Sequence, residues 1–468
     1  MMDQENHFID AGMKKASLII LTLSAFLTPF AVSSVNIALP SIGKEFGMNA
    51  ILLSWVPSAY ILSSAALLVP FGRVADLYGR KKIFGYGVLI YTASSFLLAL
   101  SISAGMVIGL RIIQGTGAAM IFAPGMAILT SVFPPGERGR AIGINVAAVY
   151  IGLSLGPVVG GFLTQHFGWR SLFVFNIPLG LVILFFTFWK LRGEWAEGKG
   201  EPFDFMGAVV YGLTLIPIMY GFSLLPGLTG YGLILFGIFG IFVLIKWEMK
   251  VKHPLLNVDL FRKNAVFAFS NLAALINYSA TFAVSFLLSL YLQYTKGLPP
   301  QEAGLILIAQ PILQALCSPI AGRLSDRVEP RIVASIGMAL TIIGLFYFVF
   351  LSPRTSIEFI LLNLALLGLG FGLFSSPNTN AIMSSVDKRF YSEASATLGT
   401  MRMVGQMFSM AIAMLIFSIY IGKVQIAPQH SELFLKSVKT AFMVFAILCF
   451  GGIFASLARG KVRGGMIG

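Results

Sequence analysis

The chain has 468 residues, of which 57% are hydrophobic and only 11% are charged. Soluble globular domains carry about 25% charged residues, so this composition excludes a soluble enzyme or binding module and indicates a polytopic membrane protein. The formal net charge of +14 does not indicate a nucleic-acid partner, because Lys and Arg gather in alternate loops between apolar segments. That asymmetry is the positive-inside pattern, and it predicts the topology and contact with anionic lipid headgroups.

Apolar segments that can cross a bilayer as helices, which takes about 20 residues each, recur along the whole chain. We predict fourteen, at residues 17–39, 51–71, 83–101, 105–130, 140–163, 171–191, 205–225, 230–247, 265–293, 302–321, 332–351, 357–385, 394–420 and 438–458. An even number of spans places both termini on one side, and the positive-inside pattern makes that side the cytoplasm. The sequence therefore predicts a multi-pass protein of the plasma membrane.

Two charged inner loops divide these spans into groups of six, two and six. In order, we predict a cytoplasmic tail (1–16), a six-helix bundle (17–191), a loop (192–204), two linker helices (205–247), a loop (248–264), a second six-helix bundle (265–458) and a cytoplasmic tail (459–468). Gly72-Arg73-Val74-Ala75-Asp76 and Gly322-Arg323-Leu324-Ser325-Asp326 close the second helix of each bundle. This weak repeat is typical of transporters whose substrate site lies near the midplane, between two halves.

Three motifs in the first bundle have spacings that a simple apolar pattern does not explain. Gly72-x-x-x-Asp76-x-x-Gly79-Arg80-Lys81-Lys82 occupies the loop after the second span, and Arg111-x-x-Gln114-Gly115-x-Gly117 lies in the fourth span. A buried arginine costs at least about 2.5 kcal/mol in a membrane, so Arg111 needs a partner or a function. The fifth span carries Gly143, Gly152, Gly156-Pro157 and Gly160-Gly161, small residues that let membrane helices approach closely.

These motifs, together with Trp169-Arg170, Asn176 and Pro178, resemble the major facilitator superfamily, and within it the fourteen-helix drug:proton antiporter family. The resemblance implies an all-α fold of two six-helix bundles plus two extra linker helices. It implies that Asp76 and Arg80 connect the two halves on the cytoplasmic side, and that Arg111 belongs to the coupling network. It also implies that Gly143, Gly152, Gly156, Pro157, Gly160 and Gly161 form a flexible contact between the halves.

One position departs from the family pattern. Members usually carry an aspartate nine residues before the proline that closes the first helix, and here Ala31 stands there, ahead of Pro40. Every Asp, Glu and His of the chain falls in a loop, a tail or a span end. Proton coupling would then use groups at the edge of the membrane, such as Asp76 with Arg111 or Glu302. A site without a buried carboxylate favours neutral or anionic amphiphiles, and Arg402 in the thirteenth span is a candidate for an anionic group.

Polar side chains inside apolar spans are candidates for the substrate cavity, because burying them is costly unless they face water, substrate or one another. The candidates are Asn36, Tyr60, Asn145, Asn271, Asn277, Tyr278, Gln310, Gln314, Asn378, Asn380 and Gln406. Each of them also has an ordinary alternative role as a hydrogen bond between helices. Phe30, Phe122, Met403 and Met407 are candidates for an adaptable apolar wall.

The sequence contains no phosphate-binding glycine loop and no cluster with metal-ligand spacing, and Cys317 and Cys449 both fall inside spans, which predicts no disulfide. We therefore expect no enzyme activity, cofactor or metal. The sequence predicts a secondary transporter, functional as a monomer, that exports hydrophobic or amphiphilic small molecules by alternating access with protons as the driving ion. A carrier of the same fold for one metabolite, such as an organic anion, is the alternative, by uniport, exchange or symport.

Overall fold

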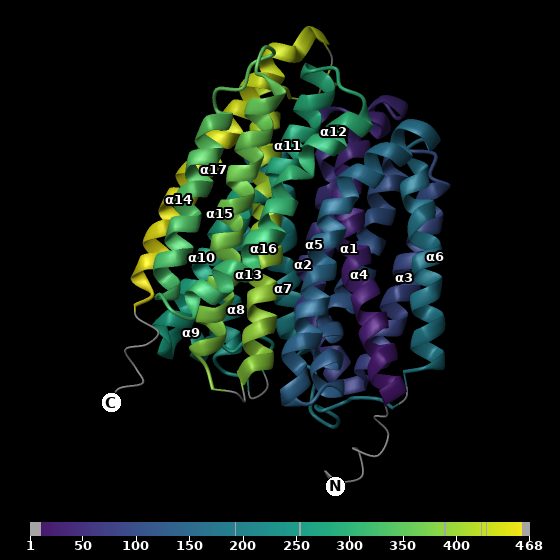
Figure 1. Ribbon diagram of the computed structural model, residues 1–468, viewed down its shortest axis with the longest axis vertical. Coiled ribbons are helices and arrows are strands. Elements are labelled where there is room, and N and C mark those ends of the chain that lie inside the picture. Colours follow the sequence, from purple (N-terminus) through teal and green to yellow (C-terminus); the bar gives the residue numbers. More distant parts are fainter. Residues whose placement is uncertain are drawn as a thin grey trace.

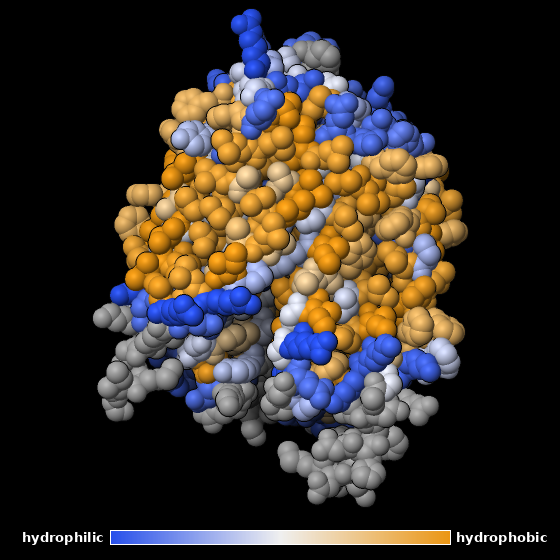
Figure 2. All heavy atoms as spheres, viewed as in Figure 1, coloured by the Kyte–Doolittle hydropathy of each residue, from blue (hydrophilic) through white to orange (hydrophobic). Residues whose placement is uncertain are grey.

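A computed structural model describes residues 11–191, 193–251, 254–387, 390–422, 424–426 and 428–460. In these residues two groups of long helices lie side by side (Figure 1). Figure 2 shows a hydrophobic belt between two bands of hydrophilic residues, as expected for a surface that faces lipid. The described residues include fourteen helical stretches that are long and apolar enough to cross a membrane, as the sequence predicted.

The N-terminal half is built from six helices that run alternately up and down. They are α1 (Ala11–Glu45), α2 (Ala50–Tyr78), α3 (Arg80–Ala99), α4 (Ala104–Val132), α5 (Pro135–Phe167) and α6 (Arg170–Trp189). Within this half α1 packs on α5, α4 packs on α2 and α3, and α6 packs on α3.

The C-terminal half follows a linker made of α7 (Phe205–Leu224), α8 (Leu228–Glu248) and α9 (Val258–Lys263). Its elements are α10 (Ala265–Thr281), α11 (Ala283–Leu290), a π-helical turn (Tyr291–Thr295), α12 (Pro300–Leu307), α13 (Ala309–Ser325), α14 (Pro330–Phe348), α15 (Ile357–Ser384), α16 (Tyr391–Tyr420), a 3₁₀ turn (Pro428–His430) and α17 (Ser431–Ala458). The first turn of α1 and the last turn of α17 both lie in the lower part of Figure 1, the side that the positive-inside pattern predicts to be cytoplasmic.

Two of the predicted loop and tail segments are partly helical. Helix α1 begins at Ala11 rather than after residue 16: no proline interrupts residues 11–16, Met13 is buried, and Lys14 pairs with Glu137 of α5 at 2.9 Å. The loop predicted at 248–264 contains α9, where Lys263 bonds Asp259 one turn earlier at 2.7 Å. The rest of both predicted tails, residues 1–10 and 461–468, lies outside the described residues.

The ninth and tenth spans each form one helical stretch, as the sequence predicted, but the regular hydrogen bonding is broken once in each. Between α10 and α11 the amide of Ala283 donates to the hydroxyl of Ser409 on α16 at 2.9 Å, which breaks the helical ladder. Between α12 and α13, Pro311 lacks the N–H that would bond the carbonyl of Leu307. Both interruptions occur in the half that supplies most of the predicted cavity residues.

The two linker helices form a hairpin with unequal contacts. Helix α7 packs on α8, on α2 of the N-terminal half and on α16 of the C-terminal half. Gly221 lies against Gly230, and Gly237 against Thr214, so the two linker backbones approach closely. The apolar window of α8 is only 17% buried, compared with 44% for α7, so α8 presents most of its surface to lipid.

Candidate functional site

The two halves are joined at their outer ends through α1 and α11. Pro40 of α1 has no N–H, so it leaves the carbonyl of Asn36 without its helical partner. That carbonyl accepts a hydrogen bond from Ser289 Oγ at 2.7 Å, and the next carbonyl, of Ile37, accepts one from Gln293 Nε2 at 3.0 Å. We call these two hydrogen bonds the outer latch. A proline in one half thus creates the acceptor that the other half uses.

A second outer contact joins α5 to α12. Gly161 lies against the backbone of Pro300, and Gly304 lies against the carbonyl of Pro157, so closely that a Cβ on either glycine would collide. Nearby, His166 Nε2 and Gln301 Oε1 are 3.1 Å apart. The backbones of the two halves are therefore in direct contact at this end.

The remaining glycines of the fifth span do not lie between the halves, where the resemblance placed them. A Cβ on Gly152, Gly156 or Gly160 would collide with α1, which belongs to the same half. The position of a Cβ on Gly143 has no atom within 4 Å. Among the described residues, Gly161 is therefore the glycine of this motif that contacts the other half. Gly152, Gly156 and Gly160, each four residues from the next, pack against α1 instead.

On the cytoplasmic side, Figure 2 shows a notch at the lower edge between the two halves. Where α2 ends and α3 begins, Arg80 donates from Nε to Asp76 at 2.7 Å and with both terminal nitrogens to Glu197, at 2.7 and 2.9 Å. Glu197 lies in the loop between α6 and α7. In this structure Asp76 and Arg80 therefore bind each other and the linker loop.

Two further acids of the same loop also bind the motif around Arg80. Glu194 accepts from the backbone N–H of Lys81 at 2.7 Å, and Glu201 pairs with Arg73 at 2.5 Å. Gly79 has φ +118°, and a Cβ there would collide with Glu194, so this position requires glycine on two grounds. We call Glu194, Glu197 and Glu201, with the groups they bind, the linker clasp.

Arg111 is fully buried within the N-terminal half and has no carboxylate partner in the described residues. Its Nε donates to the carbonyl of Val56 at 3.1 Å and its Nη1 donates to Gln114 Oε1 at 2.5 Å. Gln114 in turn donates to Ser95 Oγ at 2.8 Å, and the guanidinium lies 4.3 Å from the ring centroid of Tyr60. Tyr60 and Arg111 thus form one buried unit that links α2, α3 and α4.

Arg402 of α16 is the second arginine inside a span, and it differs from Arg111 in being partly exposed. Its guanidinium lies 5.1 Å from the ring centroid of Tyr278, and its buried Nε has no hydrogen-bond partner. Tyr278 also contacts Phe371 edge to face, with 5.3 Å between the ring centroids. We call these three residues the Arg402 cluster.

No carboxylate reaches these interior residues in the described part of the chain. Its Asp and Glu residues all lie in loops, in the short surface helix α9 or near the ends of the long helices, with Asp76 two residues from the end of α2 and Glu302 in the first turn of α12. The interior therefore presents cationic and neutral polar groups only.

The other predicted cavity residues divide into three sets. Four asparagines donate hydrogen bonds within or between helices. Asn145, Asn271 and Asn378 donate to the carbonyls of Leu21, Phe267 and Ser270, and Asn380 donates to Ser325 Oγ. Asn277 is fully buried, and neither its amide nitrogen nor its oxygen has a partner. Asn36 is also buried, and its side-chain oxygen has no partner. For the side chains of Gln310, Gln314 and Gln406 the structure gives burial alone: Gln314 is buried, and Gln310 and Gln406 are partly exposed.

The comparisons with known proteins agree with this architecture. The sequence profile described as "Major Facilitator Superfamily" matches residues 21–253 and 271–463. The chain belongs to the Major Facilitator Superfamily. It is 30% identical to the riboflavin transporter RibZ of Clostridioides difficile over 93% of this chain and 95% of that protein. It is 28% identical to the multidrug resistance protein Stp of Mycobacterium tuberculosis over 85% and 74% of the two chains.

Among solved structures, the peptide transporter POT in complex with alafosfalin superposes with a TM-score of 0.69, at 15% identity and 93% coverage of both chains. This likeness concerns the fold. As a member of the superfamily, the chain is a multi-pass secondary transporter of the plasma membrane and not an enzyme.

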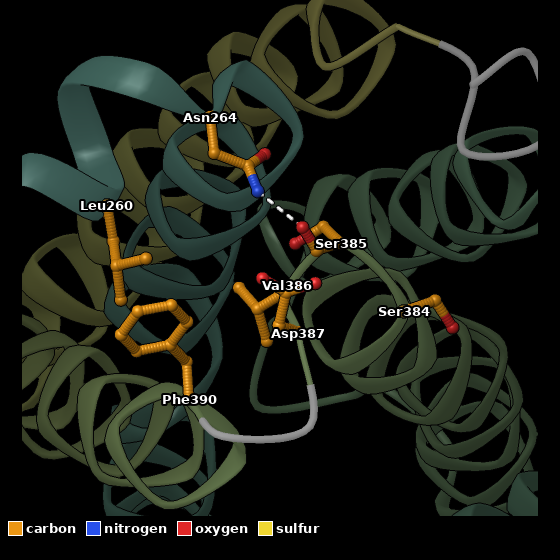
Figure 3. A pocket seen from close by; sticks show the side chains of 7 residues that line it. All are labelled: Leu260, Asn264, Ser384, Ser385, Val386, Asp387 and Phe390. Carbon is orange, nitrogen blue, oxygen red and sulfur yellow. Dashed lines mark hydrogen bonds between the residues drawn. The ribbon is translucent and has the colours of Figure 1, made fainter. Parts of the chain in front are cut away.

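A separate pocket lies in the C-terminal half of the molecule, where α9, the start of α10 and the end of α15 meet (Figure 3). It has a volume of about 270 Å³ and is lined by Leu260, Asn264, Ser384, Ser385, Val386, Asp387 and Phe390. Asn264 closes one side by donating to the carbonyl of Ser385 at 2.5 Å. None of the residues predicted for the substrate cavity lines it.

Sequence reasoning missed two groups of polar residues. Arg459, assigned to the tail, is 1% exposed and donates to Asn378 Oδ1 at 2.8 Å and Ser270 Oγ at 3.2 Å. Burial lowers the pKa of this guanidinium to about 10, so it stays charged at neutral pH. The acids of the linker clasp were predicted only as part of a charged inner loop, with no partners assigned to them. The spacing of these three acids, at positions 194, 197 and 201, was the one sequence signal for a shared binding role.

Proposed function

We propose that this transporter exports hydrophobic or amphiphilic small molecules by alternating access, with protons as the driving ion. Two features together support export best: the outer latch holds the two halves together on the outer side, and a notch separates them on the cytoplasmic side. An exporter must receive its substrate from the cytoplasmic side, and this arrangement offers such a state. Relatives named for multidrug resistance and drug efflux support the same substrate class.

The polar groups of the interior favour neutral or anionic substrates over cations. Arg402 has an unpaired Nε and no acid near it, and Tyr278 and Phe371 supply flat apolar surface. A cationic substrate would meet repulsion from Arg402 and no counter-charge, whereas an anionic group would gain a charge-assisted hydrogen bond. This observation also favours the second candidate function, a carrier for one organic anion or one planar metabolite. The relative named as a riboflavin transporter belongs to that class of function.

Counterflow in proteoliposomes, with and without an imposed pH gradient, separates these functions. Three probes cover the charge classes: ethidium as the cation, riboflavin as the neutral planar molecule and anilinonaphthalene sulfonate as the anion. We expect uptake of the anionic and neutral probes against a gradient only when the pH gradient is present. Exchange of a single probe without any effect of the pH gradient would favour the specific carrier, and preferential uptake of ethidium would contradict the charge argument.

A further inference from the structure

A groove lies within the N-terminal half, between the start of α1 and the end of α6. Its volume is about 240 Å³, and its lining includes Lys15, Ala16 and Ile19 of α1, with Phe186 and Lys190 at the end of α6. The positive-inside pattern predicts that both of these helix ends are cytoplasmic. We call this space the inner groove.

The two sides of the inner groove repeat one amphipathic arrangement. Lys15 and Ile19 are four residues apart on α1, and Phe186 and Lys190 are four residues apart at the end of α6, so each pair lies on one helix face. One helical turn rises about 5.4 Å. Each apolar side chain therefore starts about one turn deeper in the membrane than the lysine of its own helix. The inner groove is cationic toward the cytoplasm and apolar toward the bilayer centre.

The two lysines of the inner groove form no ion pair with an acid in the part of the chain that the structure describes. The neighbouring Lys14 differs from them, because its amine pairs with Glu137 of α5 at 2.9 Å. Lys190 Nζ lies 4.0 Å from the centroid of the Trp189 ring, which leaves its charge in place. Two unpaired amines that border one cavity repel each other, so the groove favours an anion between them.

Exposed side chains place the inner groove at the level of the lipid headgroups. Trp189 is the last residue of α6 and is 57% exposed, and tryptophan is enriched where the hydrocarbon core meets the headgroups. Ile19 is 44% exposed and Phe188 is 63% exposed, so lipid chains can contact both helices. Lysine side chains near the ends of spans extend toward the headgroup phosphates. An anion in the groove is therefore in contact with the bilayer as well as with the protein.

The size and polarity of the inner groove fit a lipid headgroup better than a whole drug-sized molecule. Its volume of about 240 Å³ is below the range of about 300 to 1,000 Å³ that is usual for pockets enclosing drug-sized ligands. A soluble phosphate would satisfy the two amines and leave the apolar wall uncovered. A phospholipid satisfies both, because its phosphate is anionic and its acyl chains remain in the bilayer.

We propose that the inner groove is a binding site for an anionic phospholipid of the inner leaflet. The phosphate lies between the amines of Lys15 and Lys190, and one acyl chain follows Ile19 and Phe186. The site belongs to one half of the molecule and concerns a resident lipid rather than the cargo, so it does not depend on the proposed function.

Native mass spectrometry of the full-length protein tests this site. The purified protein is titrated in detergent with phosphatidylglycerol and, separately, with phosphatidylcholine of the same acyl chains. We expect one phosphatidylglycerol to bind at least tenfold more tightly than phosphatidylcholine. The double variant Lys15→Gln/Lys190→Gln should weaken phosphatidylglycerol binding at least tenfold and leave phosphatidylcholine unchanged. Lys15→Arg/Lys190→Arg keeps both charges and should retain the binding.

Two further variants separate a built site from surface charge. Lys246→Gln on α8 is the matched control, since this exposed lysine also lies near a ring, 5.6 Å from the centroid of Phe242, but does not line the groove. It should leave phosphatidylglycerol binding unchanged. Ala16→Phe fills the groove without changing its charge and should weaken the binding as much as the double variant. Melting temperatures confirm that each variant is folded.

Four outcomes would overturn the proposal. The first is an equal loss of binding in Lys246→Gln and the double variant, and the second is undiminished binding in both the double variant and Ala16→Phe. The third is displacement of the lipid by glycerol 3-phosphate at equal concentration, which would indicate a site for soluble phosphate. The fourth is lipid binding that appears only after deletion of residues 2–10, which carry Asp3, Glu5 and Asp10, because that acidic segment would then be the occupant.

Discussion

At the scale of single residues, the interior charges of this transporter are balanced by dipoles and aromatic faces. Arg111 has the carbonyl of Val56, the amide of Gln114 and the ring of Tyr60 around it, and no acid from the part of the chain that the structure describes. Neutral acceptors leave a positive field in place, whereas a carboxylate would cancel it. The N-terminal half therefore holds a permanent buried cation, which any proton-coupled step must accommodate.

We predict that Gln114→Leu destabilises the protein by about 2 kcal/mol, because it leaves the buried guanidinium without its strongest acceptor. The measurement is the apparent melting temperature of the purified protein in detergent. Thr116→Val on the same helix is the control: Thr116 bonds only the carbonyl of Ile112 and is partly exposed, so its loss should shift the melting temperature little. Equal shifts for the two variants would contradict the assignment.

At the scale of helices, α5 uses two faces for two partners. Gly152, Gly156 and Gly160 lie against α1, whereas Pro157 and Gly161 lie against α12. Because residues four apart in a helix share a face, a single motif encodes the internal packing of one half. The contact with the other half uses the adjacent face.

Gly156→Ala should destabilise the α1–α5 pair by about 1 to 3 kcal/mol, since the new methyl group collides with Ser33 and overpacked sites must shift their backbone. Gly143→Ala places the same methyl group in open space and gains helix propensity, so it should be neutral or slightly stabilising. Thermal unfolding of both variants checks the pair. A stable Gly156→Ala protein would show that α1 and α5 are not in fixed contact.

The linker clasp is the second feature at this scale. Glu197 is 68% exposed at the side chain while Arg80 is 5% exposed, so the pair is held from one side and open to solvent on the other. Release of this pair would free Asp76 and Arg80 for contacts between the halves, which is the role that the family resemblance implies for them.

Glu197→Gln should loosen the loop at residues 194–201 by about 1 kcal/mol or less, the usual range for an exposed ion pair. Hydrogen–deuterium exchange of this loop should then be up to about fivefold faster. Lys263, whose pair with Asp259 is exposed on both sides, supplies the control: Asp259→Asn should leave exchange in the loop unchanged. Faster exchange in both variants would indicate a general loss of stability rather than a clasp.

At the scale of the whole molecule, the outer latch ties the two halves by hydrogen bonds that need no charged group. Ser289 and Gln293 bind main-chain carbonyls of α1, and the carbonyl of Asn36 is available because Pro40 lacks an N–H. An outward-open state has to break both hydrogen bonds.

The double variant Ser289→Ala/Gln293→Leu should shift the balance toward the outward-open state by about 1 to 2 kcal/mol, a factor of roughly 5 to 30 in population. Distances between spin labels on the outer ends of α1 and α11 measure the shift. Ser279→Ala removes a hydroxyl that bonds only its own helix, at Leu275, and should leave the distances unchanged. An unaltered distance distribution in the double variant would show that other contacts hold the outer side closed.

The sequence predicted the fold and the chemical character of the interior. The apolar spans were visible because a helix must bury about 20 apolar residues to cross a bilayer, and the absence of interior acids could be counted directly. Which polar residues face a cavity could not be predicted, because Asn378 and Asn277 look alike in a sequence. The partner of Asn378 is Arg459, 81 residues away, and no local pattern reports such a distant contact.

Local composition alone showed that this protein spans a membrane many times, and it predicted cytoplasmic ends and, as the described residues confirm, Asp and Glu residues only in loops and near helix ends. These properties depend on the free energy of transferring each segment from water to lipid, which is a sum of contributions from neighbouring residues. Tertiary structure decided which face of α5 meets α1, which acids bind Arg80 and which helices α7 packs against. Those features depend on how helices far apart in the chain approach one another, and that is fixed only when the whole bundle packs.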